Sequence, residues 1–243
     1  MASAGPVAGT NAVHERLRAD LLAVGAPYGL VLAGGDAVRA HGLAERVSRG
    51  VDLATEDAAP MGEIADAVRA GLEARGWVVG EVQADPLAAR LVVREAADGD
   101  ECPVDLRKEM LWRPPVMTEA GPALSLEDLV GTKVRALADR GLPRDLVGVH
   151  AVADRWSHLE LEELGRRHAP DTFDLAELQS RLTGTDWLDD SEFRRQGLDF
   201  PAVDELRRWA QQWADDIAER LLEGEPPEEE EEQENGEEPP EPD

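Results

Sequence analysis

Cysteine, long apolar runs and basic residues are all scarce in this chain of 243 residues. Cys102 is the only cysteine, which excludes an intramolecular disulfide and gives no support for secretion. The first residues lack the apolar stretch of a secretory leader, and no apolar run is long enough to span a bilayer. These absences predict a cytoplasmic protein that does not enter a membrane.

Acidic residues are in large excess, and much of the excess lies at one end. The formal net charge is −27, and the 12 acidic residues from Glu223 onward leave −15 for the rest of the chain. Residues 224–243 consist mostly of Glu and Pro and predict a disordered tail. Such a tail is either a solubilising appendage or a ligand for a basic partner or for a cleft of the same chain. The acidity disfavours tight nucleic-acid binding, although it allows a local basic cleft.

The first part of the chain alternates between helical and strand patterns. Apolar spacing and turn residues predict a helix that Asn11 caps, and then the order β, α, β, α, β, β, β. The expected strands cover 28–33, 51–54, 77–82, 89–94 and 103–106, and the expected helices cover 11–24, 36–41 and 60–75. This order predicts an α/β (α+β) fold in which helices pack on a mixed β-sheet.

The pattern changes to helix throughout after Pro114-Pro115. The first of these helices begins at Ser125, has Glu127 and Asp128 in its first turn, and stops at Gly141. Four more helical segments follow, at 144–156, 159–168, 174–182 and 201–223. We therefore expect an α/β core over residues 1–113, a helical C-terminal subdomain over 114–223 and the acidic tail over 224–243.

One candidate site feature is the Gly34-Gly35 turn between an expected strand and an expected helix. Backbone N–H groups at such a turn can bind a phosphate. Glycine pairs also close ordinary turns, so this signal is weak by itself. Asp36 would cap the helix but would repel a phosphate unless a cation lay between them.

Two aspartates lie within short apolar strands, Asp52 in VDLA and Asp105 in VDLR. Side chains alternate along a strand, so each carboxylate would point away from its apolar neighbours and toward a shared site. Carboxylate oxygens of this kind bind Mg²⁺ while it bridges nucleotide phosphates. The alternative is that each is a solvent-facing acid on a half-exposed strand.

Basic residues near the start of the helical half form a third candidate feature. Lys133 and Arg140 are two turns apart and share a helix face, and Arg144-Asp145 begins the next helix. These cations could stabilise phosphate charge, or they could form a solvated surface with ion pairs. The five histidines lack metal-ligand spacing, and the chain lacks the Gly-x-Ser-x-Gly, Walker and dinucleotide motifs.

Taken in order, the segments GGDAVRAHG, RVSRGVDLAT, CPVDLRKE and LSLEDLVGTKVRALADRGLPRDLVGVHAV carry a resemblance. From about Tyr28 to Arg155 the chain resembles the AbiEii/AbiGii-type toxin nucleotidyltransferases, part of the polymerase-beta-like nucleotidyltransferase superfamily. Their order and the Lys-x6-Arg-x3-Arg-Asp spacing carry the likeness. The matching positions are Gly34, Gly35, Asp52, Asp105, Lys133, Arg140, Arg144 and Asp145.

The resemblance implies the nucleotidyltransferase fold and a cleft that binds a nucleoside triphosphate (NTP). It implies Asp52, Asp105 and Lys133 as catalytic residues, with the two aspartates as Mg²⁺ ligands. The implied nucleotide-binding residues are Gly34, Gly35, Lys133, Arg140, Arg144 and Asp145. Active members transfer a nucleotide to an acceptor, for some toxins the 3′ end of tRNA, and many are paired with an antitoxin protein.

Three positions depart from the pattern that the resemblance implies. Gly50 replaces the first acid of the Asp-x-Asp strand, Asp36 replaces a small hydroxylated residue or tyrosine, and Gly148 replaces an acid. Loss of a metal-bridging aspartate would cost orders of magnitude in rate. Two hypotheses stay open beside a purely structural α/β domain. One is an active transferase in which Asp36 supplies the missing carboxylate, and the other is an impaired pseudo-enzyme that binds a nucleotide or a partner.

Overall fold

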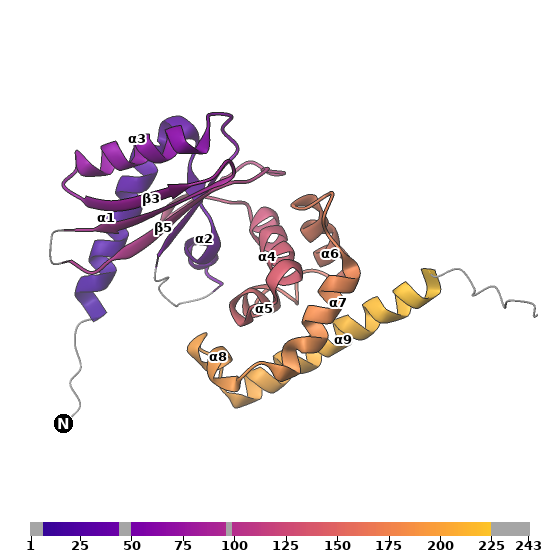
Figure 1. Cartoon of the computed structure of the whole chain (residues 1–243). Coiled ribbons are helices and arrows are strands. Elements are labelled where there is room, and N and C mark those ends of the chain that lie inside the picture. The colour runs from indigo at the N-terminus through magenta and orange to yellow at the C-terminus, as the bar shows by residue number, and fades with distance from the viewer. Residues whose placement is uncertain (1–6, 44–49, 96–98, 225–243) are drawn as a thin grey trace, which may run out of the picture.

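The computed structural model describes residues 7–43, 50–95 and 99–224 (Figure 1). Within these residues, seven strands form one sheet in the order β3-β4-β5-β2-β1-β7-β6. The pairs β1/β7 and β2/β5 are parallel and the other pairs are antiparallel, so the predicted mixed sheet is confirmed. The strands are β1 Val31–Leu32, β2 Val51–Thr55, β3 Val78–Ala84, β4 Ala88–Arg94, β5 Cys102–Lys108, β6 Val116–Thr118 and β7 Gly121–Ala123.

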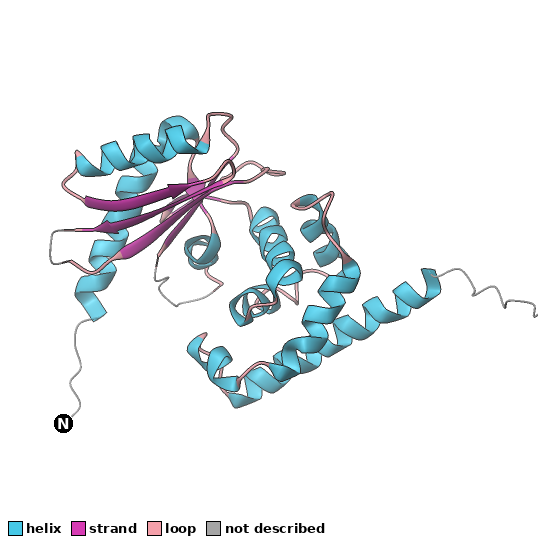
Figure 2. Cartoon of the chain, in the orientation of Figure 1, coloured by secondary structure: helices cyan, strands magenta, loops and turns pink. Residues whose placement is uncertain are grey.

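The α-helices of the described residues fall into two groups (Figure 2). Three belong to the sheet half, namely α1 Val7–Gly25, α2 Gly34–Ala40 and α3 Met61–Glu73. The others form the helical half: α4 Leu126–Arg140, α5 Pro143–His150, α6 His158–Arg167, α7 Leu175–Thr183, α8 Asp190–Arg195 and α9 Phe200–Gly224. No helix among the described residues is both long enough and apolar enough to cross a bilayer.

Helix α3 covers one face of the sheet (Figure 1). It packs across β3, β4 and β5 and against α1. Its apolar residues recur at helical spacing, so that Ile64, Val68 and Leu72 are fully buried. The alternate residues of the strands, such as Leu91 and Leu106, point into the same core. The other residues of these strands, including Asp105 of β5, therefore lie on the opposite face.

The helical half has a core of its own. Leu129 belongs to the core of the sheet half, whereas Val130 and Val134 belong to the second core. The change from one core to the other therefore occurs within α4. This helix begins and ends where the sequence predicts, because the Ser125 hydroxyl accepts a hydrogen bond from the Asp128 N–H and Gly141 takes a left-handed conformation with φ of 61°.

The prediction of helix throughout after Pro114-Pro115 is wrong. The chain first forms β6 and β7, and β7 returns to the sheet by pairing in parallel with β1. Gly121, with φ of 116°, allows the tight turn between the two strands. These strands are too short for their alternation to be recognised, and their partner is distant in sequence.

Several element ends also differ from the prediction. Helix α1 begins before Asn11, and the strand expected over 28–33 is shortened to β1 because Ala26–Tyr28 forms a 3-10 turn. Helix α8 and the 3-10 turn Gly184–Trp187 were not predicted. Residues 225–243 of the acidic tail lie outside the described residues, so the role proposed for the tail stays a prediction.

Candidate active site

Asp52 and Asp105 lie side by side on neighbouring strands. Strands β2 and β5 are parallel, and Asp52 is the register partner of Asp105. Their neighbours Leu53 and Leu106 are buried in the core on the other face. The predicted alternation is thus confirmed, and both carboxylates project from the same face of the sheet.

The Gly34-Gly35 turn contacts Asp52 directly. The Gly35 N–H donates a hydrogen bond of 3.3 Å to Oδ2 of Asp52. Gly34 has φ of 50°, and a Cβ at this position would lie 2.1 Å from the same oxygen. Glycine is therefore needed at position 34 for its conformation and for the close approach of the carboxylate.

The protonation of Asp52 reflects this crowded position. Burial raises its pKa most, and the nearby Asp105 and Asp36 carboxylates raise it further. The Gly35 N–H and the Lys133 ammonium act in the opposite direction without cancelling the shift. A cation bound between Asp52 and Asp105 would relieve their repulsion, because it would neutralise charge that the protein leaves partly uncompensated.

Lys133 extends from α4 into this region. Burial lowers its pKa, while Asp145 and Asp52 raise it and Arg140 and Arg144 lower it. The lysine is therefore within electrostatic reach of both Asp52 on strand β2 and Asp145 on helix α5. Residue Gly148 of α5 leaves space for its side chain, since a Cβ there would lie 2.8 Å from Lys133 Cδ. Position 148, where the resemblance implies an acid, is therefore packed closely against the Lys133 side chain.

Arg140 and Asp145 form a two-bond ion pair between α4 and α5. The Arg140 Nε and Nη2 atoms donate to the two Asp145 oxygens at 2.7 and 2.9 Å. Asp145 is buried, and the hydrogen bonds that it accepts raise the pKa of Arg140. The negative charge of Asp52 raises this pKa further. Arg144 is exposed at the start of α5. Asp145 therefore orients Arg140 near Asp52.

Asp36 is directed toward helix α1. It is 2% exposed, and its Oδ1 lies 3.2 Å from His14 Nε2 and 3.8 Å from Arg18 Nη1. The hydrogen bond to Asp36 is the main reason why the pKa of His14 is raised to about 9. No three His, Cys, Asp or Glu residues in the described ranges are grouped so as to hold a metal ion. The structure therefore does not bring Asp36 together with Asp52 and Asp105 as one ligand set.

Position 50 lies next to Pro103 on the face of the two aspartates. A Cβ at Gly50 would lie 2.5 Å from the Pro103 carbonyl oxygen and 2.8 Å from its Cγ. Real side chains do not approach a backbone atom so closely, so an aspartate at position 50 would require a shift of the β5 backbone. The sequence reveals the missing acid at this position, whereas only the structure reveals that Pro103 fills the space beside it.

The arrangement of Asp52, Asp105 and Gly50 determines how many divalent cations the site can bind. Two adjacent carboxylates with one raised pKa suit a single Mg²⁺, which proteins commonly bind through one or two carboxylates plus substrate phosphates. A second Mg²⁺ would need further carboxylate ligands, and a side chain at position 50 could not supply one without a shift of Pro103, because its Cβ would lie 2.5 Å from the Pro103 carbonyl oxygen. The residues therefore fit one divalent cation and do not fit a two-metal site.

A buried charged cluster, which sequence reasoning missed, connects the two halves of the molecule. Arg135 of α4 donates to both Glu109 oxygens at 2.8 and 2.6 Å, just after the end of β5. His168 Nε2 lies 3.3 Å from Asp128, and Asp128 also accepts the Trp112 N–H. The cluster fixes α4, which carries Lys133, relative to β5, which carries Asp105. Its members are far apart in sequence and have no motif spacing.

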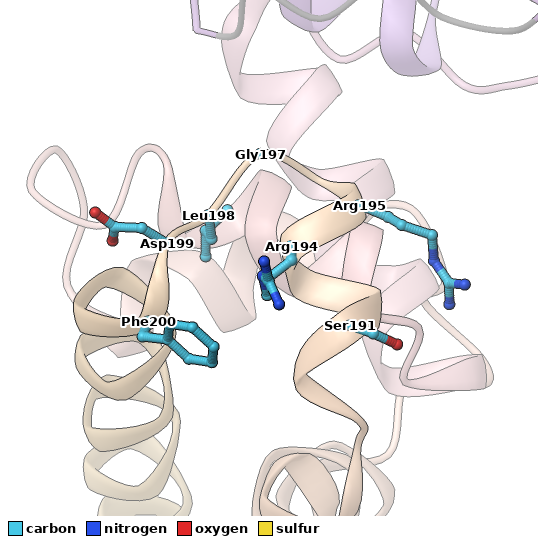
Figure 3. Close-up of a pocket in the computed structure, with 7 residues that line it drawn as sticks. All are labelled: Ser191, Arg194, Arg195, Gly197, Leu198, Asp199 and Phe200. Carbon is cyan, nitrogen blue, oxygen red and sulfur yellow. The ribbon is translucent and has the colours of Figure 1, made fainter.

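A hollow of about 540 Å³ lies between α8 and the start of α9 (Figure 3). Arg194 and Phe200 lie between the two helices, with the guanidinium carbon 4.9 Å from the ring centre, while Arg195 points away from them. None of the predicted site residues lines this hollow. It carries no grouping of carboxylates like the Asp52–Asp105 pair, which remains the candidate site.

Comparison with solved structures identifies the class to which the fold belongs. The chain is similar to JHP933 from Helicobacter pylori, with a TM-score of 0.54, 19% identity, and coverage of 90% of this chain and 96% of that one. It is also similar to MenT4, a nucleotidyltransferase toxin from Mycobacterium tuberculosis, with a TM-score of 0.56, 15% identity, and coverage of 87% and 90%. The chain has the nucleotidyltransferase fold, which confirms the predicted fold class.

The family follows from the sequence match. Residues 16–234 match the family described as nucleotidyl transferase AbiEii toxin, of type IV toxin–antitoxin systems. The chain belongs to this family, and the resemblance drawn from its motifs is confirmed. No curated protein matches the chain.

Proposed function

We propose that this protein transfers a nucleotide from an NTP to an acceptor in a Mg²⁺-dependent reaction, with the 3′ end of a tRNA as the acceptor. The observation that carries the proposal is the register pairing of Asp52 with Asp105, within electrostatic reach of Lys133. Carboxylates on a sheet near a partly buried cation form a site that can hold a metal and a triphosphate together.

Each residue has a distinct part in the proposed reaction. Asp52 and Asp105 would hold Mg²⁺, which, when bound, neutralises phosphate charge and orients the phosphates. The partly buried Lys133 ammonium would contact the triphosphate, and partial burial strengthens this attraction because water screens it less. The turn at Gly34-Gly35 would direct backbone N–H groups at the phosphates.

Arg140 and its neighbours complete the cation side of the site. Asp145 restricts Arg140 to one orientation, so little side-chain entropy is lost when its free N–H groups contact a phosphate. Arg144 is exposed in the first turn of α5 and would contact a phosphate group at the solvent-exposed side of the site. As in other toxin–antitoxin systems, we expect an antitoxin protein as the partner of this chain.

The Gly50–Pro103 contact supports a second candidate function. In this alternative the protein is a pseudo-enzyme that binds a nucleotide or a partner but does not transfer the nucleotide. A Cβ at position 50 would clash with the Pro103 backbone carbonyl and approach the proline ring, so the chain leaves little room there for another acid. Asp36, which is paired with His14, gives no support for a replacement.

Incorporation of labelled nucleotide separates the two candidates. The wild type is incubated with each labelled NTP, Mg²⁺ and a tRNA pool, and Asp52→Asn is assayed in parallel. Mg²⁺-dependent labelling that the substitution abolishes supports transfer, and labelling that it leaves unchanged refutes the site.

A second series of variants tests the pseudo-enzyme. NTP binding without labelling by the wild type supports this alternative, and normal labelling by the wild type refutes it. If the wild type binds NTP without labelling, the double variant Gly50→Asp/Gly148→Asp tests whether transfer can be restored. The structure predicts that Gly50→Asp also lowers the melting temperature, because the β5 backbone must shift.

A further inference from the structure

A row of polar side chains crosses four strands on the face of the sheet opposite α3. Asp105 pairs in register with Asp52 on one side and with Arg90 of β4 on the other. Gln83 of β3 is in turn the register partner of Arg90. Residues paired in this way point to the same face, so the row continues the metal-site carboxylates toward the sheet edge.

The contact between Arg90 and Asp105 is loose. Arg90 Nε lies 3.5 Å from Asp105 Oδ1, and the two side chains are 60% and 29% exposed. Exposed single-bond ion pairs contribute little free energy, and this one lacks the two-bond geometry of Arg140 with Asp145. The guanidinium can therefore leave Asp105 at small cost.

The surface beside this ion pair is suited to an anion. A hollow of about 250 Å³ lies against Asp105, with Arg90, Gln83 and Arg107 among its lining residues. Arg107 is exposed and, two residues after Asp105 in β5, points to the same face. The Asp85 carboxylate also lines the hollow, and it accepts hydrogen bonds from the N–H groups of Leu87 and Ala88. Two arginines and an amide thus face a small hollow directly beside the metal-site pair.

We propose that Arg90 leaves Asp105 when the two aspartates bind a divalent cation, and that it then binds a phosphate group of the NTP or of a polynucleotide acceptor. A cation on Asp105 competes with the guanidinium for the same carboxylate. It also repels the guanidinium, because both carry positive charge. The released guanidinium presents two N–H groups in the geometry that suits a phosphate. This inference rests on the proposed function, since it assigns the metal to Asp52 and Asp105.

The test measures three binding constants with purified full-length protein. The variant is Arg90→Gln, and the matched control is Arg195→Gln, an exposed arginine that pairs with an exposed acid on α8. The probes are Mn²⁺ alone, tripolyphosphate with Mn²⁺, and a single-stranded RNA oligonucleotide with Mn²⁺. The two phosphate probes distinguish the nucleotide from the acceptor as the source of the phosphate.

We expect Arg90→Gln to change the constants in opposite directions. Mn²⁺ alone should bind about two- to fivefold more tightly, because an exposed competing ion pair is lost. At least one phosphate probe should bind about tenfold more weakly, because a charge-assisted hydrogen bond is lost. Arg195→Gln should change none of the three.

Either of two results overturns the assignment of Arg90. One is an unchanged or weakened Mn²⁺ affinity in Arg90→Gln, and the other is an unchanged affinity for both phosphate probes. All three readouts are equilibrium constants, so they remain decisive for a protein that transfers no nucleotide. A lack of labelled product therefore contradicts the proposed transfer without contradicting the role of Arg90.

Discussion

The ion pair between Arg135 and Glu109 should make a large contribution to stability, and Arg135→Met tests it. Glu109 is 9% exposed, so the substitution leaves a buried carboxylate without its principal partner. Breaking a buried pair on one side costs about 3–5 kcal/mol. Methionine retains most of the apolar volume, which limits the contribution of lost packing.

The pKa of Glu109 gives a second magnitude, for its contacts with Arg135 and His168 taken together. Burial raises this pKa, whereas His168 and the hydrogen bonds from Arg135 lower it, and the balance holds it at about 2 instead of 4.5. The His168 ring lies 3.9 Å away, which is long for a hydrogen bond, so Arg135 is the closer partner. The shift corresponds to ~3 kcal/mol for Arg135 and His168 together, net of burial, which is the same order as the cost of breaking the pair.

The sign of the pH dependence follows from the lowered pKa. A carboxyl group whose folded pKa lies below its unfolded pKa stabilises the fold above pH 4.5, and this stability is lost as the pH falls toward 2. In Arg135→Met the carboxyl group loses its partner and protonates more readily. The difference in unfolding free energy between wild type and variant should therefore be largest near neutral pH and shrink below pH 4.5.

Thermal and urea unfolding provide the assay. A loss of ~3 kcal/mol lowers the melting temperature of a domain of this size by ~6–12 °C. The double variant Arg135→Met/Glu109→Gln should regain part of the loss, because it removes the unpaired charge. Arg195→Met, which breaks only an exposed ion pair, should stay within ~0.5 kcal/mol of the wild type. An Arg135→Met variant as stable as this control would refute the reasoning.

Two further predictions concern the turn and helix α1. Gly34→Ala should destabilise the fold by ~1–3 kcal/mol and weaken Mn²⁺ binding, because its Cβ would displace the Asp52 carboxylate; unchanged melting and Mn²⁺ titrations would contradict this. His14 should titrate near pH 9 by NMR, since Asp36 stabilises its protonated form. This contribution to stability is fully present below pH 6.5 and is lost as the pH rises through 9, and a measured pKa below 7 would exclude the pairing.

The sequence was most informative where a local pattern determines local structure. Apolar alternation placed Asp52 and Asp105 on one face, and the register of β2 with β5 confirms this. The Ser125 cap and the Gly141 stop identify helix α4, because capping depends on residues close to one another in the chain. The order along the chain of the Gly34-Gly35, Asp52, Asp105 and Lys133 segments was sufficient to identify the family.

The features that sequence reasoning missed depend on contacts between distant segments. Strand β7 forms because β1 offers a parallel partner, and no spacing within its three residues signals this. The place of Arg90 beside Asp105 follows from strand register, which turn lengths and packing determine. The direction of Asp36 toward His14 likewise depends on side-chain contacts between α2 and α1, which are separate in the sequence.

The most direct test of the account is the transfer of labelled nucleotide from NTP in the presence of Mg²⁺, with wild type and Asp52→Asn compared under identical conditions. The proposed site predicts a loss of about 100-fold or more in Asp52→Asn, since one of two metal-binding carboxylates is removed. The asparagine variant should retain the fold, which circular dichroism can verify. Transfer by Asp52→Asn at the wild-type rate would contradict the assignment of the Asp52–Asp105 pair as the catalytic metal site.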